Sequence, residues 1–179
     1  MIKVKPINLG ERKELESLLV ANPDVIEQGL KVISHQLKTD SGPLDILAVD
    51  SKGTLVVIEL KNEASEGHLD QGLRSYDWCR QNISLISQVY SGKNRIAPNS
   101  PPRLMLIAPS FPETVRRISK YIDVELNLVE YHAFEDVKGE RGIICTEIDH
   151  GQPPEPPELP DILTLQEKLG IFQITQITK

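Results

Sequence analysis

The first hydrophobic positions of the chain recur at the spacing of a helix. Within Glu11–Ala21, Leu15, Leu18 and Leu19 fall on one helical face. The Asn–Pro pair at positions 22 and 23 ends this pattern, because the residue before a proline avoids helical geometry. We therefore predict a helix over residues 11–21.

Three closely spaced hydrophobic runs follow, each of strand length. They cover residues 29–39, 44–50 and 54–61. The sequence DSKG at 50–53 joins the last two runs and places a glycine at the end of the connection. Because so short a connection requires antiparallel neighbours, the sequence predicts a strand followed by a β-hairpin.

The second half of the chain alternates helical and strand patterns. Hydrophobic residues recur at helical spacing from 67 to about 89, and residues 112–122 predict another helix. Between them, residues 102–110 form an apolar run typical of a strand buried on both faces. Residues 124–136 and 142–148 predict two further strands. This order favours an α/β fold with a mixed central sheet and helices on both faces.

The character of the sequence changes after residue 150. We predict one domain over 1–150, a stiff proline-rich linker over 151–160 and a C-terminal tail over 161–179. The tail can form a short helix and a strand. It would dock on its own domain, or it would bind a partner protein or a second copy of the chain.

The composition is that of a soluble globular protein. Of the 179 residues, 39% are hydrophobic and 26% charged, and no apolar stretch is long enough to span a bilayer. The N-terminus has no apolar signal core, and the two cysteines, Cys79 and Cys145, lie far apart without a CxxC motif. These features predict a cytoplasmic protein without a membrane partner, and they argue against a disulfide framework or a zinc site.

Charge is distributed unevenly along the chain. The net charge is −6, yet residues 67–122 contain eight Lys or Arg and three acids. This basic segment is either a nucleic-acid-binding face or ordinary helix-surface charge. If it binds nucleic acid, the candidate phosphate contacts are Arg74, Arg80, Arg116, Arg117 and Lys120.

Two carboxylates and a lysine interrupt the otherwise apolar hairpin. Folding about the 50–53 turn places Asp45 opposite Ile58 or Glu59, and Glu59 and Lys61 share one face of their strand. Two partly buried carboxylates repel each other and lose hydration, so a cation must offset them. Mg²⁺ or Mn²⁺, which prefer oxygen ligands, would suit this position. A salt-bridge triad at a sheet edge is the alternative.

The ordered motifs resemble the PD-(D/E)xK nuclease superfamily. They read PLD at 43–45 and ELK at 59–61, with an acidic helix before the hairpin and DQGLRSYDW after it. The sequence is most similar to the nuclease domain of the NucS/EndoMS group, over roughly Glu11–Phe134. In that group a DNA-binding and dimerising domain precedes the nuclease domain, whereas this sequence begins almost at the nuclease helix. We therefore do not carry over mismatch or branch specificity.

The resemblance implies a Mg²⁺- or Mn²⁺-dependent endonuclease that hydrolyses DNA phosphodiester bonds by metal-activated water, with DNA repair or defence as its setting. RNA is the other candidate substrate. An inactive binding or interaction module on the same fold is the alternative function, and an unrelated α/β protein is the third. The implied metal ligands are Asp45, Glu59, the Leu60 carbonyl and Glu16; Lys61 and Gln71 complete the catalytic set.

One motif departs from the pattern that the resemblance implies. Gln71 matches the glutamine of a Q-x-x-x-Y helix, but Ser75 stands where the tyrosine is expected and Tyr76 follows one place later. Arg74 lies three residues from Gln71, on the same helical face. It is therefore the first candidate for a phosphate contact near the metal.

Overall fold

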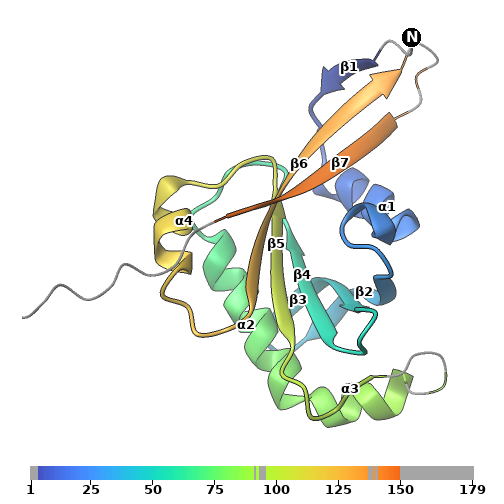
Figure 1. Ribbon diagram of the computed structural model, residues 1–179, viewed down its shortest axis with the longest axis vertical. Coiled ribbons are helices and arrows are strands. Elements are labelled where there is room, and N and C mark those ends of the chain that lie inside the picture. Colours follow the sequence, from blue (N-terminus) through green and yellow to red (C-terminus); the bar gives the residue numbers. More distant parts are fainter. Residues whose placement is uncertain (1–3, 91, 93–95, 137–138, 140, 150–179) are drawn as a thin grey trace, which may run out of the picture.

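The computed structural model describes residues 4–149 except 91, 93–95, 137–138 and 140, and over this range the chain forms a seven-stranded sheet between helices (Figure 1). The helices are α1 (Arg12–Ala21), the 3-10 helix η1 (Pro23–Val25), α2 (His68–Gln81), α3 (Ile83–Tyr90) and α4 (Glu113–Ser119). The strands are β1 (Val4–Ile7), β2 (Lys31–Thr39), β3 (Gly42–Val49), β4 (Leu55–Leu60), β5 (Arg103–Ala108), β6 (Leu126–Asp136) and β7 (Arg141–Ile148).

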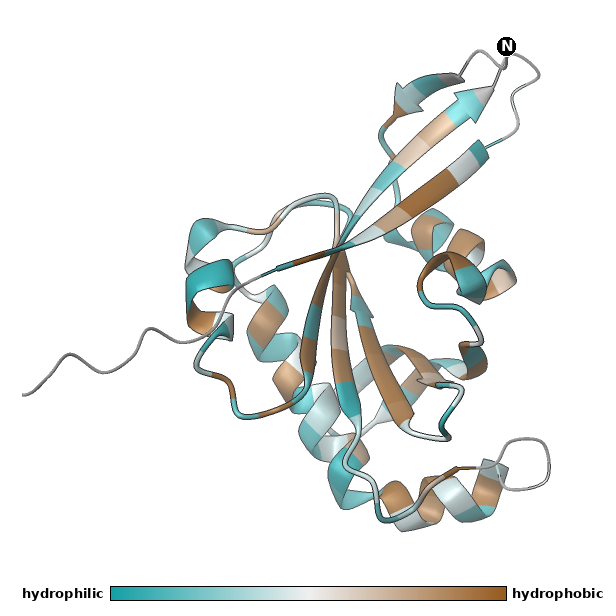
Figure 2. Ribbon diagram, viewed as in Figure 1, coloured by the Kyte–Doolittle hydropathy of each residue, from teal (hydrophilic) through white to brown (hydrophobic). Residues whose placement is uncertain are grey.

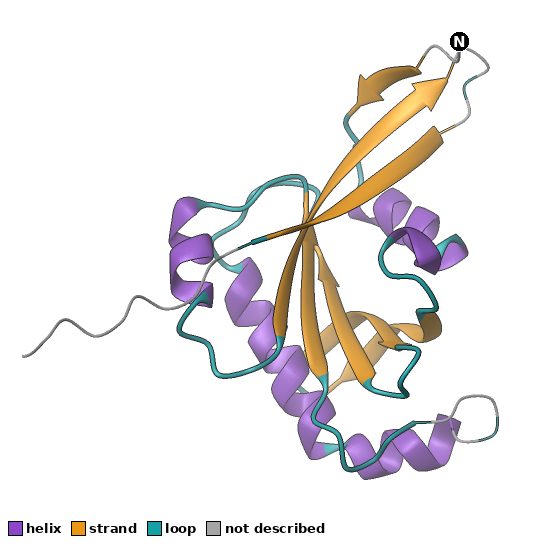
Figure 3. Ribbon diagram, in the orientation of Figure 1, coloured by secondary structure: helices purple, strands orange, loops and turns teal. Residues whose placement is uncertain are grey.

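The sheet is mixed, as the sequence predicts. Strands β2, β3 and β4 pair antiparallel in chain order, whereas β4, β5 and β6 are parallel neighbours. Helices lie on both sides of these strands (Figure 3). The predicted fold class, a mixed α/β domain with a flanked central sheet, is confirmed.

Alternation along the central strands creates two hydrophobic cores. Leu55 and Val57 of β4 pack in the core that contains α2 and α4, while Val56 and Ile58 pack in the core that contains α1. Figure 2 shows the hydrophobic residues concentrated on these central strands. Because β4 is buried on both faces, polar side chains near its end are enclosed by protein.

Strand β6 is long enough to serve two parts of the sheet. Its residues 126–130 pair with β5, and its residues 133–136 pair with β1. Strand β7 pairs with β6 over residues 128–135, and the three strands β1, β6 and β7 project together beyond the helices (Figure 1).

Two elements differ from the sequence prediction. Strand β1 was not predicted, so the observed order begins with a strand rather than with a helix. The single helix predicted from 67 to 89 is two helices, because Asn82 caps α2 through its backbone and its side-chain amide, both directed at the Trp78 carbonyl. The linker and tail predicted over 151–160 and 161–179 lie outside the described residues and stay predictions.

Close packing of α2 on β5 depends on Gly72. A Cβ at this position would lie 2.5 Å from Leu106 Cδ2 and 3.3 Å from two carbons of Leu104. Both leucines are fully buried, so the core has little room to move. Gly72 therefore fixes the distance between the sheet and the helix that carries Gln71.

We expect Gly72→Val to lower the free energy of unfolding by about 1–3 kcal/mol, because it overpacks the core beneath α2. Chemical denaturation measured by circular dichroism checks this value. Gly67→Ala is the matched control, since a Cβ there has no atom closer than Ser65 Oγ at 3.9 Å. Equal stability of the two variants would contradict the proposed close approach.

Candidate active site

The hairpin brings Asp45 and Glu59 together. Leu47 pairs with Val57 and Ile46 with Ile58 at the end of the regular register, and just beyond it the carboxyl groups of Asp45 and Glu59 are close enough to share a hydrogen bond. Both carboxylates are fully buried, and the Leu60 backbone N–H donates to Asp45 Oδ2 over 2.9 Å. Asp45 and Glu59 are therefore neighbours across the hairpin, as the turn predicts.

The backbone is distorted where Asp45 lies. Leu44 and Ile46 pack in different cores, although residues two apart in a regular strand face the same way. On the neighbouring strand, Gln36 has a φ of +48°, a left-handed conformation uncommon outside glycine. Its side-chain amide donates to Glu16 Oε2 over 2.5 Å and lies 3.4 Å from Asp45 Oδ1. This distortion turns Gln36 toward the carboxylates.

Glu59 occupies the most strongly perturbed position in the site. Burial and, after it, the charge of Asp45 raise the pKa of its carboxyl from 4.5 to about 8. A hydrogen bond between the two carboxyl groups acts in the same direction, while a hydrogen bond from Ser75 opposes it. Without a compensating cation, the pair therefore holds a proton near neutral pH.

Helix α2 supplies two donors to Glu59, one helical turn apart. Gln71 Nε2 donates to Glu59 Oε2 over 2.6 Å, and the Ser75 hydroxyl donates to Oε1 over 2.6 Å. Ser75 thus acts directly on the carboxylate from the position where the resemblance implies a tyrosine, while Tyr76 is buried in the core. Sequence reasoning missed Ser75, although its spacing of four from Gln71 was a usable signal.

Lys61 is connected to this pair through Gln71. Its ammonium donates to Gln71 Oε1 over 2.8 Å, and its backbone N–H donates to the Ile107 carbonyl over 2.9 Å. The amide of Gln71 therefore accepts from the lysine and donates to Glu59. This arrangement fixes a positive charge beside the carboxylates.

His68 contacts the backbone near the end of β4. Its ring is fully buried, stacks on Phe111 at a centroid distance of 5.8 Å, and donates from Nε2 to the Glu59 carbonyl over 3.0 Å. Burial lowers the pKa of His68 to about 4, and the positive charge of Lys61 acts in the same direction. A neutral His68 thus holds the backbone of Glu59 in place.

Glu16 reaches the same region from α1 and is buried there. Its Oε1 lies 2.9 Å from His35 Nδ1, and its Oε2 accepts the Gln36 amide. Among the described residues, no three His, Cys, Asp or Glu side chains gather closely enough to form a metal cluster. The structure brings Asp45 and Glu59 together. The assignment of Glu16 and of the Leu60 carbonyl as further metal ligands stays a prediction.

The predicted phosphate contacts lie on α2, on α4 and, for Lys120, at the C-terminal end of α4. Arg74 is exposed and pairs with Asp70 over 2.9 Å, one turn earlier on the same helix. Arg116 pairs with Glu130 over 2.5 Å. The other members of this set are Arg80, Arg117 and Lys120. Their assignment as contacts to the nucleic-acid phosphates stays a prediction.

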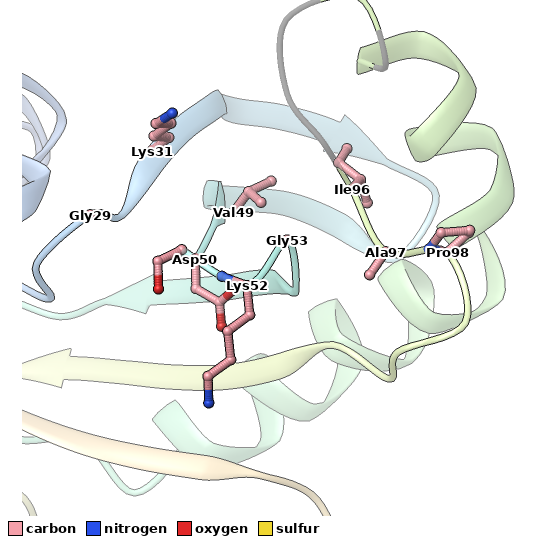
Figure 4. A pocket seen from close by; sticks show the side chains of 10 residues that line it. Gly29, Lys31, Val49, Asp50, Lys52, Gly53, Ile96, Ala97 and Pro98 are labelled. Atoms are coloured by element: carbon pink, nitrogen blue, oxygen red, sulfur yellow. Dashed lines mark hydrogen bonds between the residues drawn. The ribbon is translucent and has the colours of Figure 1, made fainter.

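A pocket at the opposite end of β4 is separate from these side chains. It has a volume of about 560 Å³ and is lined by the Asp50–Gly53 turn together with Lys31 and Ile96 (Figure 4). Among the described residues, its charged lining consists of Lys31, Lys52 and Asp50. The carboxylate pair therefore defines the candidate site by its chemistry, and not by the volume of a cavity.

The fold and the site define a mixed α/β domain whose buried carboxylates and lysine converge at the end of a hairpin. Residues 11–88 of this domain match the family model of the Endonuclease NucS C-terminal domain. The matched segment runs from α1 into α3 and carries Asp45, Glu59 and Lys61.

Curated relatives extend this similarity to more of the chain. Endonuclease NucS 2 of Halobacterium salinarum is 36% identical over 109 residues, which make up 60% of this chain and 37% of the relative. Endonuclease NucS of Thermococcus kodakarensis is 30% identical over 121 residues, 68% of this chain and 42% of the relative. The chain thus spans about two fifths of the length of these relatives.

Two solved structures also align with the chain. A chain from a complex of EndoMS with dsDNA2 aligns with a TM-score of 0.47 and 25% identity, over 70% of this chain and 47% of that one. A repair endonuclease from Pyrococcus abyssi aligns with a TM-score of 0.45 and 24% identity, over 68% of this chain and 48% of that one.

No helix in the described part of the chain is both long and apolar enough to cross a membrane.

Proposed function

We propose that this chain is a nuclease domain of the NucS type, within the PD-(D/E)xK superfamily, and that it hydrolyses DNA phosphodiester bonds with the help of Mg²⁺ or Mn²⁺. The observation that carries the proposal is the fully buried pair of Asp45 and Glu59, connected through Gln71 to the ammonium of Lys61. The match to the Endonuclease NucS C-terminal domain supports it.

The donor set fits a hard divalent cation. Two adjacent buried carboxylates offer oxygen ligands, and the raised pKa of Glu59 reflects its burial beside a second carboxylate. Asp45 and Glu59 would hold the ion, with Glu16 and the Leu60 carbonyl as further candidates. When bound, such an ion supplies Lewis-acid activation of water and neutralises charge on the phosphate.

The residues around the carboxylates have separate tasks in this proposal. Gln71 and Ser75 orient the two oxygens of Glu59, each through a 2.6 Å hydrogen bond. Lys61, fixed by Gln71, stabilises the negative charge that develops on the phosphate oxygens. Because these donors are already ordered by α2, little reorganisation is needed when the substrate binds.

Cleavage of labelled DNA tests the proposed function. Linear, single-stranded, branched and mismatched substrates are incubated with the full chain in Mg²⁺, in Mn²⁺ and in EDTA, beside an RNA of equal length. We expect DNA cleavage that requires the divalent ion and is lost in Asp45→Asn. Protein that binds these substrates but cleaves none of them in either metal would instead support a binding module.

We expect Arg74→Ala to weaken DNA binding alike across sequences and to flatten the salt dependence of binding by about one log–log unit, because one phosphate contact is lost. Binding is measured against salt in Ca²⁺. Asp70→Ala, which removes the partner of Arg74 and leaves the arginine in place, is the control. An unchanged slope in Arg74→Ala would assign this arginine to the solvated helix surface.

A further inference from the structure

Arg12 contacts the carboxylate pair from the side opposite α2. Its Nη1 lies 3.1 Å from Asp45 Oδ1 and 3.4 Å from Oδ2. The arginine side chain is 36% exposed, whereas that of Asp45 is completely buried. The guanidinium therefore sits at the boundary between the buried carboxylates and solvent.

The position of Arg12 is unfavourable for helix α1 itself. It is the first residue of the helix, where the helix dipole disfavours a positive side chain. The preceding residue, Glu11, makes no side-chain capping bond that would favour this start. The contact with Asp45 is therefore what holds the guanidinium at this place.

Arg12 and Lys61 flank the carboxylates from two different elements. Arg12 approaches Asp45 from α1, and Lys61 is joined to Glu59 through Gln71 of α2. A divalent ion held by Asp45 would compete with Arg12 for this carboxylate. The displaced guanidinium would then face the solvent side of the site, where a phosphate must enter.

We propose that Arg12 is a substrate-binding residue, which neutralises Asp45 in the metal-free protein and binds a non-bridging oxygen of the DNA phosphate once a divalent ion takes Asp45. This inference rests on the proposed function. A planar guanidinium suits the task because its N–H groups match phosphate oxygens in a bidentate geometry. Arg12 would thus keep the site balanced in charge both before and after the ion binds.

The experiment compares Arg12→Gln with Lys13→Gln, which removes the same charge from an exposed neighbouring residue. Ca²⁺ binding is measured by calorimetry without DNA. We expect Arg12→Gln to bind Ca²⁺ about tenfold more tightly than wild type, because a charged competitor for Asp45 is gone. Lys13→Gln should bind Ca²⁺ as wild type does.

Measurements of DNA binding and cleavage show whether Arg12 contacts the substrate or serves only as the counter-ion of Asp45. In Ca²⁺, Arg12→Gln should lose affinity for DNA and about one unit of salt slope, and in Mg²⁺ it should cleave ten- to hundredfold more slowly. Arg12→Lys, which keeps the charge without the fork, should retain the slope and recover only part of the rate. Arg12→Lys also tests the proposal if Arg12→Gln fails to fold.

Two results would overturn the inference in distinguishable ways. If wild type cleaves while Arg12→Gln and Lys13→Gln match it in DNA affinity and rate, Arg12 is only a counter-ion and the proposed function stands. If wild type cleaves no substrate in Mg²⁺ or Mn²⁺, the proposed function itself fails, and the role of Arg12 fails with it.

Discussion

Lys61→Ala is expected to reduce metal-dependent DNA cleavage by roughly a hundred- to thousandfold while the fold stays intact. The expected loss corresponds to about 3–4 kcal/mol of transition-state stabilisation, the usual cost of removing one preorganised donor from a buried site. The ammonium is held 2.8 Å from Gln71 Oε1, so its charge is already positioned beside Glu59 before the substrate binds. Single-turnover rates in Mg²⁺ measure the effect.

Lys52→Ala is the matched control for this variant. Lys52 is exposed in the turn at the other end of β4, so its removal changes the net charge equally without touching the site. Far-UV circular dichroism should be identical for both variants and wild type. A Lys61→Ala protein that cleaves within about threefold of wild type would contradict the role assigned to this lysine.

Glu59→Gln is expected to abolish cleavage and, at the same time, to stabilise the metal-free protein near pH 8. The amide keeps the shape of the carboxyl group and removes the charge that burial and Asp45 oppose. Because the two effects have opposite signs, a nonspecific loss of folding cannot produce both. Thermal denaturation in EDTA and cleavage in Mg²⁺ measure the two effects separately.

The pH dependence of stability follows from the raised pKa of Glu59. Between its ordinary value of 4.5 and about 8, the folded protein keeps a proton on this carboxyl that the unfolded chain has released. The stability that this group contributes is therefore fully present below pH 4.5 and is lost progressively as the pH rises toward 8. Glu59→Gln should lack this loss.

Glu63→Gln controls for a general change in charge, since Glu63 is exposed and lies only four residues further along the chain. Its stability in EDTA should follow the wild-type curve from pH 4.5 to 8. If wild type and Glu59→Gln also lose stability in parallel over this range, Glu59 does not hold a proton in the metal-free protein.

The carboxylate pair was predictable because its geometry is local. The short turn at 50–53 sets the register of the hairpin, and the period of two along a strand places Glu59 and Lys61 on one face. The helical period likewise predicts that α2 can present several side chains to that face. The side chains that the site draws from β3, β4 and α2 were therefore predictable from the strand and helix periods.

Contacts that depend on the path of α1 were not predictable. Arg12 contacts Asp45, which lies 33 residues further along the chain. The hydrophobic pattern of α1 predicts which helical face is buried, but it does not predict which strand residues the first turn of the helix contacts. The positive φ of Gln36 also leaves no hydrophobic pattern, because it arises from pairing against a distorted neighbour. These tertiary features decide which side chains surround the carboxylates.

Strand β1 was missed for a different reason. Its sequence VKPI is short and contains a proline, which the propensity rules assign to loops and edge positions. It forms a strand because β6 extends past β5 and leaves its residues 133–136 to be paired. Strand formation here depends on a partner more than a hundred residues away.

The central claim is that Asp45 and Glu59 together hold a divalent ion, and anomalous diffraction from Mn²⁺-soaked crystals tests it most directly. We expect an anomalous peak in contact with both carboxylates at about 2.0–2.3 Å, the range of hard-cation oxygen ligands. The peak should be absent in Glu59→Gln crystals soaked under the same conditions. Well-diffracting wild-type crystals with no peak between Asp45 and Glu59, at Mn²⁺ concentrations that support DNA binding, would contradict the claim.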